Sequence, residues 1–195
     1  VLQDLKRSVR RLATTALDVT GLLSALSTIR LRNRCVVLTY HRVIEDGDRQ
    51  RSSSHPGIVV SKDNFEMNMR YIADHLRPMT LDMFEHHLAE REPFPAGSCL
   101  VTFDDGWIDN YEVALPILKA HQIPATIFLP VDYISNDKMF WQEELFMRLN
   151  AQAAGADRPQ AREHEIREHI SRLKQGGNDA IDRAIDDARS NTADL

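Results

Sequence analysis

Three short runs of apolar and β-branched residues stand out in the first two thirds of the chain, at residues 35–40, 100–103 and 125–129. Each run is too short for a helix and is nearly continuous in apolar residues, which is typical of strands that are buried on both faces. Between the runs, apolar residues recur at helical spacing, with Ser61 and Thr80 as candidate N-caps. The order of strand, helix, strand, helix and strand predicts right-handed crossovers and a parallel sheet. We therefore expect an α/β fold.

The two ends of the chain are predicted to be helical. Residues 2–30 place leucine and valine at helical spacing with lysine and arginine opposite, which indicates an amphipathic helix on the flank of the domain. A basic anchor for a membrane surface is the alternative for this helix. Residues 141–150 and 159–189 carry thin apolar stripes among many charged residues, and Gly176 with Gly177 divides the second stretch into two helices. Residues 42–60 are polar and rich in Ser, Pro and Gly, which predicts a long loop.

Composition and charge exclude several classes of protein. The 195 residues are 43% hydrophobic and 27% charged, as in an ordinary globular domain. The net charge is −5 with both signs interspersed, so we expect no nucleic-acid partner. No run of about 18 apolar residues occurs, which predicts no transmembrane segment. Neither Cys35 nor Cys99 belongs to a CxxC pair and no secretory signal is recognisable, so we expect free thiols and a cytoplasmic protein.

The candidate chemistry lies where the second run ends, at Asp104, Asp105 and Gly106. Side chains alternate across a strand, so two adjacent aspartates can converge on one site only at its end, and Gly106 permits the backbone angles of such an ending. Two close carboxylates repel each other unless a cation lies between them or one keeps a proton, an arrangement that suits metal-assisted hydrolysis. The alternative is that both aspartates begin a loop and cap the following helix.

Three further side chains are candidates for contact with a substrate. The carboxyl ends of parallel strands meet at one edge of a sheet, so His41, at the end of the first run, should lie next to Asp104. It either touches substrate or metal-bound water, or holds a neighbouring loop by a hydrogen bond. Trp107 and Trp141 either line a sugar groove or pack structurally. Tyr111 is expected in the core or close behind the site.

The ordered motifs resemble one protein family. Residues 102–106 (TFDDG) resemble the first motif of the polysaccharide deacetylases, the nodulation-factor deacetylase homology domain of carbohydrate esterase family 4. Residues 38–43 (LTYHRV) resemble the first-strand signature of the bacterial branch of that family. Residues 107–118 and 123–128 continue in the order of the family, so the resemblance covers residues 35–145.

The resemblance implies a fold, an activity and a site. The fold is a distorted (β/α) barrel, of which residues 35–145 would be the N-terminal portion, after a helical segment at 1–34. The activity is removal of acetyl groups from an N-acetylated polysaccharide or oligosaccharide, the implied glycan substrate. Asp104 would be the general base, and Asp105 would bind a divalent metal, zinc with cobalt or nickel as the alternatives.

The chain departs from the family in its metal ligands. The His-Ser/Thr-x-x-His motif that normally completes the metal site is absent, and His86 and His87 cannot replace it because adjacent residues on a helix diverge by about 100°. In the bacterial branch of the family a helical insertion often follows a Phe-Trp pair. Phe140 and Trp141 form such a pair in this chain, and residues 146–195 would be the insertion. We expect the chain to end inside that insertion and to be inactive alone. The alternative is a degenerate relative that binds a glycan or a protein partner without turnover.

Overall fold

The computed structural model describes residues 31–45, 47, 52, 54–152 and 159–192. The helix expected over residues 2–30 lies outside this described part. Among the described residues, 31–43 and 62–128 belong to one compact unit, and those within 44–61 and 129–192 belong to a second. The boundaries expected at residues 34 and 145 stay predictions, and each unit is described by itself below.

The first unit is built on a parallel sheet with β5 (Ser98–Asp104) at its centre. β1 (Val36–Tyr40) pairs with one edge of β5, with Val36 opposite Cys99 and Tyr40 opposite Phe103. β4 (Arg77–Pro78) and β6 (Ala125–Phe128) each pair in parallel with β5, at residues 98–99 and 101–104. The predicted α/β class with a parallel sheet is confirmed. The two-residue strand β4 was missed because it contains a proline and is too short to show a period.

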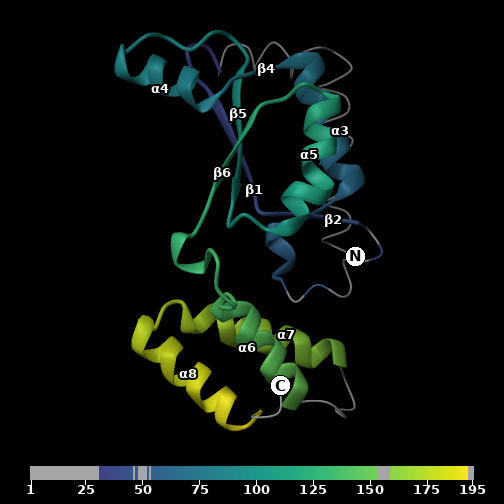
Figure 1. The fold of residues 1–195 in the computed structure, drawn as a ribbon, viewed down its shortest axis with the longest axis vertical. Helices are drawn as coiled ribbons and strands as arrows, with labels where there is room; N and C mark the ends of the chain where they lie inside the picture. The colour runs from purple at the N-terminus through teal and green to yellow at the C-terminus, as the bar shows by residue number, and fades with distance from the viewer. Residues whose placement is uncertain (1–30, 46, 48–51, 53, 153–158, 193–195) are drawn as a thin grey trace, which may run out of the picture. The chain divides into compact units, whose positions relative to one another are not determined.

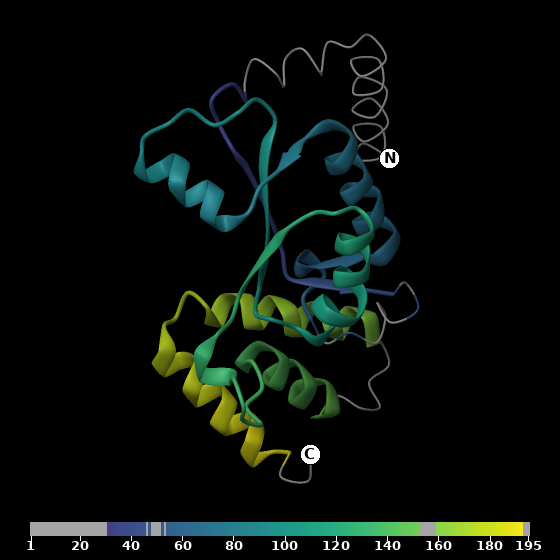
Figure 2. The ribbon, with the colours of Figure 1, turned by 45° about the horizontal axis from the view of Figure 1, so that its top comes forward.

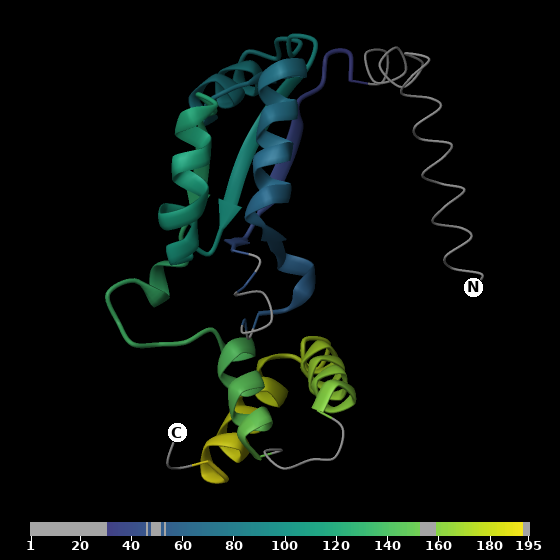
Figure 3. The same cartoon turned by 90° about the vertical axis from the view of Figure 1, so that its right-hand side faces the viewer.

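Helices α3 (Lys62–His75) and α5 (Leu115–Ala120) lie side by side along the sheet (Figures 1 and 3). α4 (Leu81–Ala89) begins at the predicted cap, where Thr80 Oγ1 accepts a hydrogen bond from the Met83 amide at 3.3 Å. The π-helical turn η3 (Asn110–Ala114) runs directly into α5.

The core of the first unit forms where α3 meets the sheet. The rings of Tyr40, Phe65 and Phe103 contact one another, with centroids 5.0–5.8 Å apart. β5 is buried over its whole length except Asp104, as expected, but Val37 on β1 is 48% exposed and Ile127 on β6 is 46% exposed. The expectation that all three strands are buried on both faces was therefore wrong for β1 and β6. In the described part only β5 has a strand on each side. The side chains of β1 and β6 are therefore less buried by neighbouring strands.

The two cysteines are free, as expected, and both belong to the first unit. Cys99 is fully buried on β5, and burial together with the nearby Cys35 raises the pKa of its thiol to about 11. Burial also raises the pKa of Cys35, whose Sγ lies 3.9 Å from Met79 Sδ. Both thiols therefore stay protonated near neutral pH and serve packing.

The second unit is mainly helical, with α6 (Trp141–Gln152), α7 (Pro159–Leu173) and α8 (Asn178–Ser190) as shown in Figure 2. All three predicted helices are confirmed. They enclose a small core, and Trp141, Leu149, Leu173 and Ala184 pack around it. Its buried members are Leu145, Phe146, Ile166, Ile170 and Ala188.

The segment predicted as a loop over residues 42–60 contains regular structure. β2 (Arg42–Ile44) and β3 (Val59–Ser61) pair in a two-stranded sheet, and the 3₁₀ turn η2 (Pro56–Ile58) precedes β3. Ser61 ends β3 and is buried, and α3 begins at the next residue. Strands of three residues are too short to be recognised from a period of two. No helix in the described residues is long and apolar enough to cross a bilayer.

An ion-pair cluster joins α6 to α8. Glu144 Oε1 accepts hydrogen bonds from Arg148 Nε at 2.9 Å and Arg189 Nε at 2.8 Å, and its Oε2 accepts one from Arg189 Nη2 at 2.8 Å. Arg148 also donates to the carbonyl oxygen of Thr192 at 3.1 Å. The hydrogen bonds from Arg189 are the main cause that lowers the pKa of Glu144 below its ordinary value of about 4.5.

The cluster predicts a pH dependence of the stability of the helical unit. Because the folded pKa of Glu144 lies below the unfolded one, its contribution is fully present above about pH 4.5 and is lost as the pH falls through the folded pKa. We expect Glu144→Gln to lower the free energy of unfolding by about 1 kcal/mol near pH 7. Thermal melts of both proteins at neutral and acidic pH measure the difference, which should shrink below about pH 4. A difference that is the same at every pH would contradict the ion-pair explanation.

Candidate active site

The aspartate doublet lies at the carboxyl end of β5, as predicted. Asp104 is the last residue of the strand, and its side chain is 38% exposed. Asp105 and Gly106 both have left-handed backbones, with φ of +72° and +64°. Aspartate tolerates this conformation better than most residues, and glycine adopts it freely. The chain therefore turns sharply directly after Asp104. Because the strand ends there, the side chains of Asp104 and Asp105 do not have to point to opposite faces of the sheet.

The helix-capping alternative for this doublet is wrong. The N-cap positions of η3 and α5 are Asp109 and Ala114, and neither makes a side-chain capping hydrogen bond. Asp105 Oδ2 instead accepts a hydrogen bond of 3.4 Å from Trp107 Nε1. Both carboxylates are thus left for interactions at the edge of the sheet.

His41 lies beside Asp104, as predicted from the order of the strands. The register that places Tyr40 opposite Phe103 brings the next residue of each strand together. His41 Nε2 lies 3.7 Å from Asp104 Oδ2, and the two side chains are 32% and 38% exposed. This distance is too long for a direct hydrogen bond but short enough for an ion pair when the imidazole is protonated.

A buried polar network that was not predicted from the sequence holds the backbone next to the site. The Asp109 side chain is 8% exposed, and its Oδ2 accepts a hydrogen bond from Arg42 Nε at 2.9 Å and forms an ion pair with Arg42 Nη2 at 2.8 Å. Its Oδ1 accepts from the Val43 amide at 3.0 Å and from Asn110 Nδ2 at 3.3 Å. Asn110 Nδ2 also donates to the His41 carbonyl oxygen at 2.7 Å. The network therefore fixes the backbone that carries His41.

Trp107 connects this network to the aspartate doublet. The Arg42 guanidinium carbon lies 4.3 Å from the centroid of the indole, so one face of the ring is covered by a cation. The indole Nε1 also donates the hydrogen bond to Asp105. Trp107 thus contacts both Arg42 and Asp105, and its contact with a sugar stays a prediction.

The sequence singled out two other aromatic residues, Trp141 and Tyr111. Trp141 belongs to the second unit, as the first residue of α6, where it lines a cavity of that unit. Tyr111 was expected in the core or close behind the site, but its side chain is 70% exposed. The expectation was therefore wrong: within η3 the buried residues are Asn110 and Ala114, and Tyr111 lies on the exposed side of the turn.

The signals for the missed network were present but weak. Arg42 follows His41 directly, and Asp109 and Asn110 lie within the segment that resembles the family. Nothing in the local pattern states that Arg42 pairs with a residue 67 positions away.

The described residues supply an incomplete set of metal ligands. Among them no group of three or more His, Cys, Asp or Glu side chains could hold a metal ion. Zinc takes three or four protein ligands in its sites, and Asp105 would provide one. The donor set of the described part therefore does not fit a complete metal centre.

Comparison with known proteins places these residues in a family. A family model described as polysaccharide deacetylase matches residues 91–191, just over half of the chain. The chain is 29% identical over 110 residues to YxkH of Bacillus subtilis, a match that covers 56% of this chain and 36% of YxkH. It is also 29% identical over 113 residues to the poly-β-1,6-N-acetyl-D-glucosamine N-deacetylase of Staphylococcus aureus, which covers 54% of this chain and 39% of that enzyme.

Solved structures give a partial match. IcaB from Ammonifex degensii aligns over 58% of this chain and 47% of its own chain, with 28% identity and a TM-score of 0.45. The Streptococcus pyogenes deacetylase PplD, in complex with acetate, covers the same 58% of this chain and 51% of its own, with 22% identity and a TM-score of 0.44. The chain spans little more than a third of the length of the curated relatives it matches.

Proposed function

Because this chain belongs to the polysaccharide deacetylase family, we propose that the protein containing it hydrolyses N-acetyl groups of a polysaccharide or oligosaccharide. The observation that carries the proposal is the position of Asp104 at the carboxyl end of β5, partly exposed and 3.7 Å from His41. The name of the Staphylococcus aureus relative makes β-1,6-linked N-acetylglucosamine the first substrate class to test.

In the proposed reaction Asp104 is the general base. Its carboxylate takes a proton from a water molecule as the water oxygen attacks the acetamide carbonyl carbon. When the carbon–nitrogen bond breaks, that proton passes to the leaving nitrogen, which gives a free amine and acetic acid, and the acid then loses its proton to form acetate. His41, whose Nε2 lies 3.7 Å from Asp104 Oδ2, is placed to contact the substrate or the attacking water.

We propose Asp105 as one ligand of a divalent metal, zinc with cobalt or nickel as the alternatives. The proposal is supported by family membership and by the sharp turn that directs Asp105 away from the strand. Among the described residues no group of three or more His, Cys, Asp or Glu side chains completes such a site.

Acetate release is the direct test of the proposed function. The protein from the whole reading frame that contains these residues is incubated with chitooligosaccharide and with β-1,6-linked N-acetylglucosamine oligomers, with and without a chelator. We expect acetate release that the chelator suppresses. Absence of release from every N-acetylated glycan would contradict the proposal.

The assignment of Asp105 predicts a loss of metal in Asp105→Ala. Removal of one of the few ligands of a metal should lower affinity by more than the about 10- to 100-fold typical of outer-shell changes. Metal content after dialysis, measured by mass spectrometry on the same whole protein, checks this result. Asp74→Ala, an exposed aspartate of α3, is the matched control. An unchanged metal content in Asp105→Ala would contradict the assignment and would make Asp104 the metal ligand and Asp105 the general base.

A second candidate function is glycan binding without turnover. The incomplete donor set among the described residues is the observation that favours it. Saturable binding of the same oligomers without acetate release, by the protein from the whole reading frame, would establish it in place of hydrolysis.

A further inference from the structure

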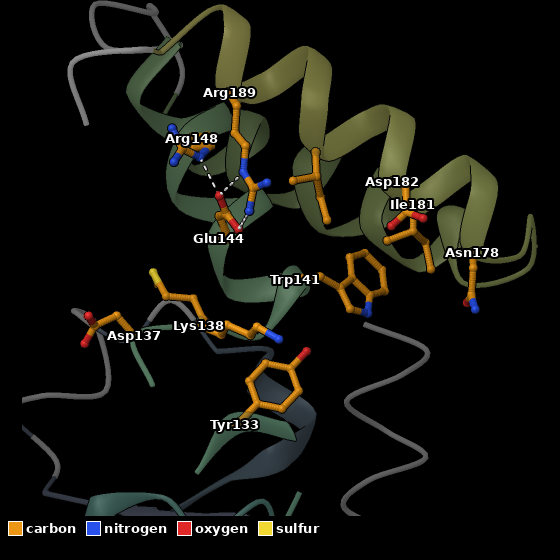
Figure 4. Close-up of a pocket in the computed structure, with 12 residues that line it drawn as sticks. Tyr133, Asp137, Lys138, Trp141, Glu144, Arg148, Asn178, Ile181, Asp182 and Arg189 are labelled. Atoms are coloured by element: carbon orange, nitrogen blue, oxygen red, sulfur yellow. Dashed lines mark hydrogen bonds and ion pairs between the residues drawn. The ribbon is translucent and has the colours of Figure 1, made fainter. Parts of the chain in front are cut away.

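A cavity of about 650 Å³ opens on the helical unit. It lies within the range of about 300–1,000 Å³ that small-molecule sites occupy. All of its lining residues belong to this unit, from η4 (Val131–Tyr133), the segment that follows it, α6 and α8. Figure 4 shows Asn178, Ile181 and Asp182 projecting from α8 on the same side as the indole of Trp141.

Two aromatic rings give the cavity flat apolar surfaces. Trp141 is half-buried and packs against the core of the helical unit. Tyr133 is half-buried, and its ring packs on Phe140 with the centroids 4.6 Å apart. Both rings are therefore held in place before any ligand arrives, which lowers the entropic cost of binding. Rings of this kind contact a ligand through an apolar face and keep a polar edge in water.

Polar side chains surround these rings. Asp137 and Lys138 come from the segment before α6, and Asn178 and Asp182 come from the first turns of α8. All four are exposed. Together they offer carboxylate and amide acceptors with amide and ammonium donors, which matches a ligand with many hydroxyl groups.

The charges in the wall cancel. Three acidic and three basic residues line the cavity, and the Glu144 carboxylate is bonded to both arginines of the lining, as the dashed lines in Figure 4 mark. The remaining charges are those of Asp137, Lys138 and Asp182. A wall without excess positive charge gives no electrostatic preference for a phosphate or another anion, and therefore favours a neutral ligand.

We propose that this cavity is a saccharide-binding site that holds a neutral N-acetylated sugar unit against Trp141 and Tyr133. The presence of a site follows from the aromatic rings, the hydroxyl-matching groups and the balanced charge. The identity of the sugar rests on the proposed function, because a deacetylase must hold an N-acetylated polymer.

The test is binding of N,N′-diacetylchitobiose and of a β-1,6-linked N-acetylglucosamine trimer. The chain has two tryptophans, so Trp107→Phe leaves Trp141 as the single indole reporter in the 195-residue chain. We expect a saturable change in its emission with at least one of the two sugars. Asp182→Ala and Asn178→Ala, both exposed on α8, should each weaken binding about tenfold, because each removes hydrogen bonds to the sugar. Asp187→Ala, an exposed aspartate of α8 that lines another cavity, should leave it unchanged.

Three outcomes would contradict the proposed site. The first is no saturable change of the Trp141 emission with either sugar, and the second is an equal loss of sugar affinity in Asp182→Ala and Asp187→Ala. The third is tighter binding of glucosamine 6-phosphate than of the neutral sugars. Parallel acetate assays on the protein from the whole reading frame separate this proposal from the proposed function. Acetate release without sugar binding here contradicts only the saccharide site, whereas binding without acetate release contradicts only the deacetylase.

Discussion

Replacement of Asp104 by asparagine is expected to lower acetate release by about 10²- to 10⁴-fold, the usual contribution of a general base. Asparagine has nearly the same shape as aspartate but cannot take a proton from water at neutral pH. Because the Asp104 side chain is 38% exposed and its ion pair among the described residues is the 3.7 Å contact with His41, the fold should be little affected.

Three measurements separate this result from a structural effect. Acetate release by the protein from the whole reading frame gives the activity, circular dichroism gives the fold, and metal content should be unchanged. Asp74→Asn on α3 is the matched control and should keep full activity. His41→Gln should lower activity less, because His41 lies beside the proposed base but does not itself take the proton from water. Full activity in Asp104→Asn would remove Asp104 from the role of base.

Replacement of Asp109 by alanine is expected to destabilise the first unit by about 3–5 kcal/mol. The change removes one buried carboxylate that forms an ion pair with Arg42 and accepts hydrogen bonds from Arg42 Nε, the Val43 amide and Asn110. Arg42 would then keep a largely buried charge without its carboxylate partner, which is the costly part of breaking such a pair. Asp109→Asn should cost less, because its amide oxygen can still accept a hydrogen bond.

Urea unfolding followed by tryptophan emission measures this effect. In a Trp141→Phe background Trp107 is the single indole, and it lies against Arg42, so its signal reports on the network itself. Asp74→Ala, which is exposed on α3, serves as the control and should change stability by less than about 0.5 kcal/mol. A loss of less than about 1 kcal/mol in Asp109→Ala would show that the network does not hold the site together.

The sequence determined the elements that have a clear period or a strong local signal. The apolar run of β5, buried from Ser98 to Phe103, identified the central strand, and the parallel order placed His41 beside Asp104. The Thr80 cap and the helices of residues 141–150 and 159–189 were predicted correctly for the same reason. The ordered motifs also indicated the polysaccharide deacetylase family, whose model matches residues 91–191.

The tertiary structure alone decided the interactions between residues that lie far apart in the chain. Arg42 and Asp109 are 67 positions apart, and Glu144 and Arg189 are 45 apart, so no local period relates either pair. The exposure of a strand also depends on which strands and helices cover it. For this reason several side chains of β1 and β6 are exposed, although the sequences of these strands are as apolar as that of β5. Local hydrophobic patterns determine which segments become strands and helices, whereas the pairing of polar side chains depends on which segments folding brings together.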